Sequence, residues 1–150
     1  MTAGNPEAAR AYDAALAYLF SATNYEKMRR VRYNADTFSL DRMHRLLAAL
    51  GDPHRRLRAV HVAGTKGKGS TAAMVHRLAV AAGLRTGLYT SPHLVDIRER
   101  IRIDERMIAA DALARLIRRA RPHVDRMRAA GDAPTFFEIF TAMAFCHFVD

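Results

Sequence analysis

The chain has 150 residues and a formal net charge of +9, from 24 lysines and arginines against 15 aspartates and glutamates. A chain of this length buries about 70% of its unfolded surface, and its 50% of hydrophobic residues indicate one globular domain rather than a disordered segment. The single cysteine, Cys146, excludes an internal disulfide, and no run approaches the roughly 20 apolar residues that span a bilayer. We expect a soluble cytoplasmic protein without a membrane partner.

Apolar residues at helical spacing predict helices over 7–20 and 39–50, the second opened by Ser39 and closed by Gly51. The run "AVHVA" at 59–63 predicts a buried strand, and the pattern that follows predicts a helix over 70–82 that ends at Gly83.

A second strand is expected in "RTGLYTS", and "RERIRIDERMI" alternates arginine with isoleucine as in a hairpin or an edge strand, with its arginines on an exposed face. Helical spacing returns at 109–121, stops before Pro122 and resumes weakly beyond it. The last segment, "TFFEIFTAMAFCHFV", is apolar on nearly every side, which predicts a helix buried on both sides. The alternation of element types favours one α/β unit.

The basic charge is dispersed over the chain. Arginine pairs such as Arg29-Arg30 and Arg118-Arg119 have acids interleaved between them, and no aromatic residues alternate with them as a stacking platform requires. Solvated helix faces explain this pattern better than a nucleic-acid surface.

The stretch "AGTKGKGS" at 63–70 holds two of the three lysines, between the first predicted strand and the helix that follows. A strand, a glycine-rich turn and a helix N-terminus together place backbone N–H groups and the positive end of the helix dipole at one point, which is an anion site. Glycine allows close approach to phosphate, and lysine adds a charge that reaches the outer phosphates.

Three interpretations of this loop compete. The usual Walker A spacing is not met, because only two residues separate Gly64 from Gly67 and Gly69 follows Lys68. The dinucleotide pattern is met by Gly67, Gly69 and Ala72, but it also requires an acid for the ribose at the end of the second strand. Positions 86–91 hold none, and the first acid after the loop is Asp96. A tight turn with packing glycines explains the glycines but not the lysines, which favour a triphosphate.

Three motifs in order carry a family resemblance: "VAGTKGKGS", "GLYTSPHLVDIRERIRI" and "PTFFEIFTAMAF". From about Tyr18 to its last residue the chain resembles the N-terminal half of folylpolyglutamate synthase/dihydrofolate synthase, in the Mur ligase superfamily. The family loop usually has asparagine where this chain has Lys66. The short spacing that fails the Walker A pattern is the form this superfamily uses.

The resemblance implies a P-loop NTPase-like α/β fold, the central domain of Mur ligases, with a mostly parallel sheet flanked by helices. Residues 1–58 would form a helical lead-in and residues 59–150 the P-loop core, in a single partial ATP-binding domain. The C-terminal glutamate-binding domain of the family would be absent. We therefore expect a truncated enzyme, which by itself binds Mg-ATP weakly at best and ligates nothing.

The resemblance also implies an ATP-dependent amide ligase that joins L-glutamate to dihydropteroate, to folate or to both through an acyl phosphate, with ATP and Mg²⁺ as cofactors and a monomer as the complete enzyme. Lys68 would be the catalytic lysine, while Ser91 and Glu138 would hold Mg²⁺. The pteroate-bearing substrate would contact Thr37, Phe38, Ser39 and Leu40. The residues that would bind the ATP phosphates are Gly64, Thr65, Lys66, Gly67, Lys68, Gly69 and Ser70.

Glu138 is informative without any family. Its neighbours in sequence are Phe136, Phe137, Ile139 and Phe140, so an unpaired carboxylate here would cost several kcal/mol of desolvation. Either a metal ion or an arginine is therefore expected beside it. The competing function is a non-catalytic, basic P-loop module that binds a nucleotide or another polyanion; a dehydrogenase ranks third, because the ribose acid is missing.

Overall fold

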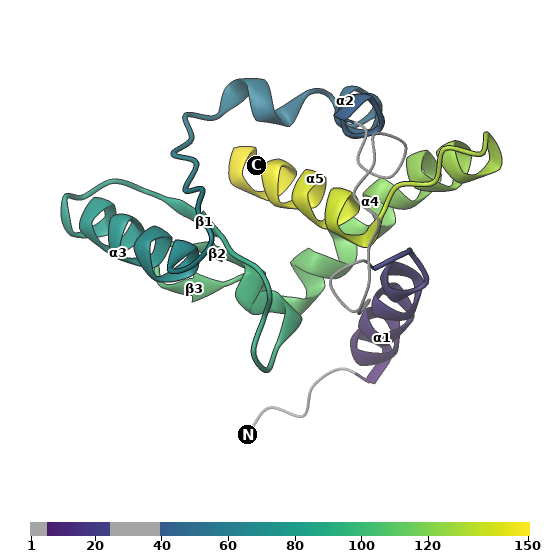
Figure 1. Ribbon diagram of the computed structural model, residues 1–150. Coiled ribbons are helices and arrows are strands. Elements are labelled where there is room, and N and C mark those ends of the chain that lie inside the picture. Colours follow the sequence, from purple (N-terminus) through teal and green to yellow (C-terminus); the bar gives the residue numbers. More distant parts are fainter. Residues whose placement is uncertain (1–5, 25–39) are drawn as a thin grey trace.

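The computed structural model describes residues 6–24 and 40–150. Helix α5 (Phe136–Val149) lies at the centre of the molecule, and α1 (Pro6–Phe20), α2 (Leu40–Ala49) and α4 (Ala110–Ala129) surround it together with the short 3₁₀ helix η2 (Pro53–Arg56) (Figure 1). Helix α1 packs mainly on α4, whereas α2, η2 and α4 all contact α5. The N-terminal helices therefore pack directly on the last helix of the chain.

The helices expected at 7–20 and 39–50 are confirmed by α1 and α2, and Gly51 ends the second with a positive φ of 88°. The expected stop before Pro122 is wrong, because α4 continues through this proline to Ala129. Proline removes one backbone hydrogen bond, to the carbonyl of residue 118. Buried residues lie on both sides of it, Ala120 before and Val124 after, so packing of one continuous face outweighs that loss.

Residues 87–107 form a small antiparallel sheet with strand order β1 (Gly87–Tyr89), β2 (Ile101–Ile103) and β3 (Arg106–Met107). Gly87 pairs with Ile103, and the β2–β3 turn places Asp104 at φ 52°. The strand expected in "RTGLYTS" and the hairpin expected in "RERIRIDERMI" are both confirmed. A short 3₁₀ helix, η3 (Ile97–Arg100), leads into β2.

The strand expected at 59–63 is wrong, because these residues have no regular structure and Val60 is 76% exposed. A strand needs a neighbour for its N–H and C=O groups, and none of the three strands in the described residues pairs with this segment. All pairings among the described residues are antiparallel, so the mostly parallel sheet is not observed in 6–24 and 40–150.

Helix α3 (Lys68–Ala81) confirms the expected helix but begins two residues earlier. It lies against the sheet on the side away from α1 and α4 (Figure 1). The buried His76 fixes this contact: its Nε2 lies 2.6 Å from the carbonyl oxygen of Asp104, and its Nδ1 lies 3.1 Å from Thr86 Oγ1. The middle of α3 is thereby tied to the hairpin.

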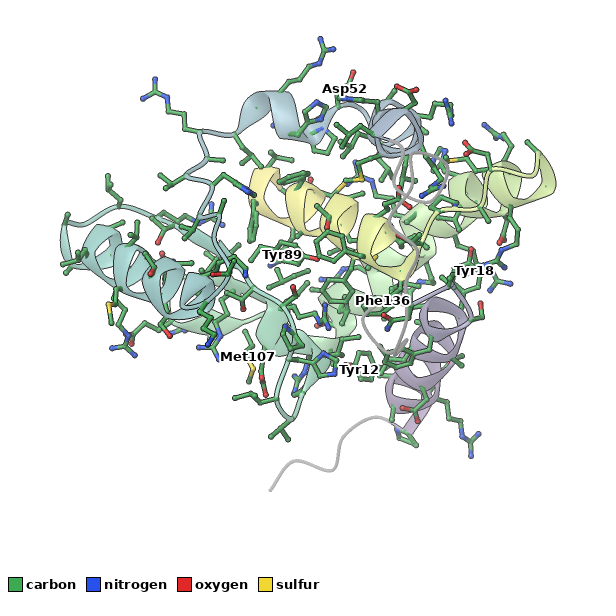
Figure 2. The ribbon with its side chains drawn as sticks, in the orientation of Figure 1. Tyr12, Tyr18, Asp52, Tyr89, Met107 and Phe136 are labelled. Atoms are coloured by element: carbon green, nitrogen blue, oxygen red, sulfur yellow. The ribbon has the colours of Figure 1, made fainter. Side chains whose placement is uncertain are left out.

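The core is built on α5, as its apolar composition predicts, and it draws residues from α1, α2 and α4. Tyr89 of β1, labelled in Figure 2, points toward α5. Its ring lies beside those of Phe137 and Phe140 and so joins the sheet to this helix. None of the helices in 6–24 and 40–150 is both long and apolar enough to cross a membrane. The largest fully buried apolar side chains are Leu19, Leu46, Ile101, Leu113, Ile117, Phe136, Ile139, Phe140 and Met143.

Gly87 of β1 tests this packing, because a Cβ added there would lie 2.5 Å from a ring carbon of Phe148. We expect Gly87→Ala to lower the free energy of unfolding by about 1–3 kcal/mol through overpacking. Gly69→Ala is the matched control, since nothing lies within 4 Å of the added atom and the position is helical. Chemical denaturation of both variants measures the difference, and equal stabilities would contradict the packing of β1 on α5.

Candidate nucleotide and metal site

The loop before α3 presents its backbone to solvent. Residues 64–71 are all exposed, and Gly67 is the N-cap of α3 in the left-handed conformation, with φ 75° and ψ −1°. Gly64 also has a positive φ, of 150°. Side chains at these two positions would strain the backbone, so the glycines permit the turn that brings the loop to the helix end.

Lys68, the first residue of α3, folds back over the loop. Its Nζ donates to the carbonyl oxygen of Gly64 at 2.6 Å and reaches that of Thr65 at 3.4 Å. The ammonium group therefore lies over the loop that leads into α3, and the first backbone N–H groups of this helix have no partner within it. A phosphate accepts from such N–H groups and is attracted by both the lysine and the helix dipole, so the loop has the donors that a polyphosphate needs.

The segment after β1 that carries Ser91 is held by the side chain of Glu99. The Glu99 carboxylate accepts from the backbone N–H groups of Leu94, Val95 and Asp96 at 2.8, 3.1 and 2.9 Å. These bonds hold the pKa of Glu99 below its usual range. Ser91 is exposed on this segment, and its hydroxyl is accessible to a ligand.

Arg100 supports the same segment from inside the protein. It is 2% exposed, its Nε donates to His93 Nδ1 at 2.9 Å, and its guanidinium lies 5.2 Å and 5.7 Å from the ring centres of Phe136 and Phe140. The expectation that the "RERIRI" arginines form an exposed strand face is therefore wrong for Arg100. Stacking on two aromatic faces and a bond to histidine replace the water that this guanidinium loses.

Glu138 is held at the N-terminus of α5. It forms a capping box with Thr135: its Oε2 accepts from the backbone N and from Oγ1 of Thr135, both at 2.8 Å, while Thr135 Oγ1 accepts from the backbone N of Glu138 at 3.2 Å. Arg42 of α2 donates from Nε to Oε1 and Oε2 at 3.0 and 2.9 Å. The two side chains are 12% and 13% exposed, so the arginine that was one of two expected partners is present.

Ser91 and Glu138 lie on neighbouring elements. Thr141 Oγ1 donates to the Tyr89 hydroxyl at 3.1 Å, and the rings of Tyr89 and Phe137 are 6.1 Å apart, so the end of β1 packs on the first turns of α5. No group of three or more metal-binding side chains occurs in 6–24 and 40–150. Mg²⁺ does not need one, because it commonly takes one or two protein oxygens together with phosphates and water. A hydroxyl and a carboxylate fit that requirement.

The four residues expected to contact the pteroate-bearing substrate are described only in part. Thr37, Phe38 and Ser39 lie outside the described residues. Leu40 is the first residue of α2 and is 75% exposed, which leaves its side chain accessible.

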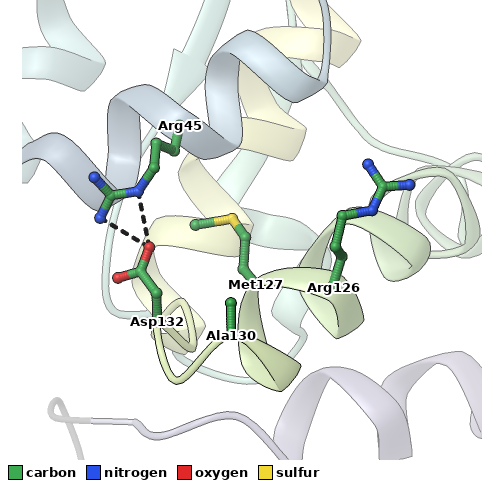
Figure 3. A pocket seen from close by; sticks show the side chains of 5 residues that line it. All are labelled: Arg45, Arg126, Met127, Ala130 and Asp132. Atoms are coloured by element: carbon green, nitrogen blue, oxygen red, sulfur yellow. Dashed lines mark hydrogen bonds and ion pairs between the residues drawn. The ribbon is translucent and has the colours of Figure 1, made fainter.

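A shallow pocket of about 550 Å³ lies elsewhere, between α2 and the end of α4 (Figure 3). The Arg45–Asp132 ion pair crosses it, and none of its lining residues belongs to the expected site. It is lined by Arg45, Arg126, Met127, Ala130 and Asp132.

Sequence reasoning did not find the residues that support the site. Thr135 had a signal, because Thr-x-x-Glu before an apolar run is the capping-box pattern. No sequence pattern marks Arg42 or Arg100, because tertiary packing brings their partners to them. Arg42 and Glu138, for example, are 96 residues apart in the sequence. In a chain rich in arginine, composition does not distinguish these two from the exposed ones.

No family model matches the chain. Among curated proteins, it is 42% identical over 137 residues to a probable bifunctional folylpolyglutamate synthase/dihydropteroate synthase of Haloferax volcanii, with 91% of this chain and 15% of the relative covered. It is 40% identical over 112 residues to the dihydrofolate synthase/folylpolyglutamate synthase of Bacillus subtilis, with 74% and 26% covered.

Solved structures agree. The folylpolyglutamate synthase of Thermotoga maritima matches with a TM-score of 0.80 and 36% identity over 93% of this chain and 30% of that one. The Mycobacterium tuberculosis enzyme complexed with ADP matches with a TM-score of 0.80 and 35% identity, covering 95% and 30%. A folylpolyglutamate synthase complex with AMPPCP and folate matches with a TM-score of 0.78 and 35% identity, covering 91% and 32%.

The fold thus matches a part of the folylpolyglutamate synthase fold. The resemblance predicted from the three motifs is confirmed: over most of its length the chain is similar to folylpolyglutamate synthases and dihydrofolate synthases. It spans a third or less of the relatives it matches.

The two loop lysines differ in position, and their variants should differ in effect. Lys68→Ala removes the ammonium that lies over the loop, so we expect ATP affinity to fall by about 1.5–3 kcal/mol, the value of a hydrogen bond to a charged group. Lys66→Asn restores the common family residue at an exposed position and should change affinity by less than about 0.5 kcal/mol. Titration calorimetry with Mg-ATP compares them, and full affinity in Lys68→Ala would exclude its role.

Proposed function

We propose that this chain is the ATP-binding part of a cytoplasmic, monomeric ATP-dependent amide ligase that joins L-glutamate to dihydropteroate, folate or both through an acyl phosphate. The observation that carries the proposal is the exposed glycine loop at 64–67, closed by Lys68 at the N-terminus of α3. Similar proteins also support the proposal. They are named folylpolyglutamate synthases, and structures of some of them contain ADP, AMPPCP or AMPPCP with folate.

In this proposal the loop holds ATP by its phosphates. Backbone N–H groups of residues 64–70 donate to the phosphate oxygens, and the Lys68 ammonium turns from the Gly64 carbonyl to the outer phosphates. Phosphoryl transfer depends mostly on positioning and charge neutralisation, and this loop supplies both. The carboxylate of the acceptor then takes the outer phosphoryl group and ADP leaves; the amine of glutamate displaces phosphate from the acyl phosphate and loses a proton to form the amide.

Ser91 and Glu138 are the residues that would hold Mg²⁺. The Ser91 hydroxyl is exposed at the end of β1, and the Glu138 carboxylate is fixed by its capping box at the start of α5. Mg²⁺ would neutralise charge on the transferred phosphoryl group. The acceptor would lie against the segment that ends at Leu40, where α2 begins.

Nucleotide preference tests the proposal. We expect Mg-ATP to bind, NAD not to bind, and EDTA to weaken ATP binding at least about tenfold, because the cation bridges protein and phosphate. Ser91→Ala and Glu138→Gln should reduce the EDTA effect while leaving binding of ATP in EDTA unchanged. Calorimetric titrations of the three proteins with both nucleotides give these values.

Acceptor binding separates a ligase from a simple nucleotide module. Pterin fluorescence should report dihydropteroate or folate binding in the presence of Mg-AMPPCP, and the better ligand identifies the acceptor. Binding of nucleotide without dependence on Mg²⁺, or equal binding of unrelated polyanions, would instead support a non-catalytic polyanion module.

A further inference from the structure

The Arg42–Glu138 pair lies where the proposed cation site requires a carboxylate. Arg42 is in the first turn of α2, and Glu138 is in the first turn of α5. Their side chains are largely buried, at 12% and 13% exposure, and the Nε of Arg42 lies about equally far, 3.0 and 2.9 Å, from the two carboxylate oxygens. A buried pair of this kind resists screening by salt, so each partner strongly affects what else the other can bind.

The two oxygens of Glu138 have different surroundings. Oε2 accepts from Arg42 and from two groups of Thr135, its backbone N and its hydroxyl. Oε1 accepts from Arg42 at 3.0 Å. Because the capping box holds Oε2 independently of α2, the carboxylate keeps its position in α5 even where the arginine is replaced.

A divalent cation at Oε1 would meet the guanidinium at short range. Both are positive, and both are attracted to the same carboxylate oxygen. Repulsion between charges a few ångströms apart is large in a partly buried site. The arginine must therefore weaken cation binding, by an amount that depends on how closely it remains at Glu138.

We propose that Arg42 is a positioning residue that competes with the divalent cation for Glu138 and thereby sets the cation affinity of the site. This inference rests on the proposed function for the role of Glu138. It assigns to α2 a direct influence on the metal, carried by one side chain rather than by the loop that binds ATP. Arg45, three residues further along α2, has no such role, because it pairs with the more exposed Asp132.

Mn²⁺ alone is a suitable probe, because it prefers the same oxygen ligands as Mg²⁺ and its free concentration is measured by electron paramagnetic resonance. Arg42→Met removes the charge and keeps an apolar stem of similar length. We expect it to bind Mn²⁺ at least about fivefold more tightly than the unchanged chain, by relief of charge repulsion. Arg42→Lys, which keeps a positive charge, and Arg45→Met, the matched control on the same helix, should stay within about twofold.

The double variant Arg42→Met/Glu138→Gln should lose the gain, because the cation would have no carboxylate to bind. Melting temperatures of all variants verify that they fold; if Arg42→Met does not fold, Arg42→Gln replaces it. Affinity of the Met or Gln variant equal to or below that of the unchanged chain would overturn the inference. Failure of the nucleotide titrations with a gain in Mn²⁺ affinity would instead count against the proposed function alone.

Discussion

Helix α5 carries few polar side chains, so the rest of the chain has to cover it. Seven of its fourteen residues are buried, and α1, α2, α4, η2 and β1 all contact it. Burial of this surface favours one arrangement of the helices, because any other leaves aromatic and aliphatic side chains in water. Helix α4 contributes to this cover and also packs on α1, and its buried residues continue past Pro122 from Ala120 to Val124.

The two parts of the candidate site are held by different contacts, and the part that contains Ser91 and Glu138 depends on the first turns of α5. Arg100 stacks on Phe136 and Phe140 and donates to His93, which steadies the segment after β1. Glu138 is held by its own capping box and by Arg42. The loop at 64–67 has a different anchor, since α3 is tied to the hairpin through His76. The phosphate part and the carboxylate part of the site are thus supported by separate contacts.

Local signals in the sequence predicted the helices, the hairpin and the glycine loop, since periodicity and glycine depend on nearby residues. The strand expected at 59–63 failed because strand formation depends on a partner that no local pattern reveals. The exposure of Arg100 was predicted wrongly for a related reason. The alternation around Ile101 and Ile103 indicates a strand, but whether an arginine beside it is exposed or buried depends on which elements pack on that face. The sequence predicted that either an arginine or a metal ion would lie beside Glu138. That the arginine is Arg42 could be seen only in the folded structure.

We propose that the glycine loop and the start of α5 form one Mg-ATP site. A crystal structure of the chain with AMPPCP and Mg²⁺ would show whether they do. We expect phosphate oxygens within hydrogen-bond distance of the backbone N–H groups of residues 64–70 and of Lys68 Nζ, and a cation at Glu138 Oε1 and the Ser91 hydroxyl with the Arg42 guanidinium displaced. Phosphates bound away from the loop, or a cation remote from Glu138 with the arginine pair unchanged, would contradict it.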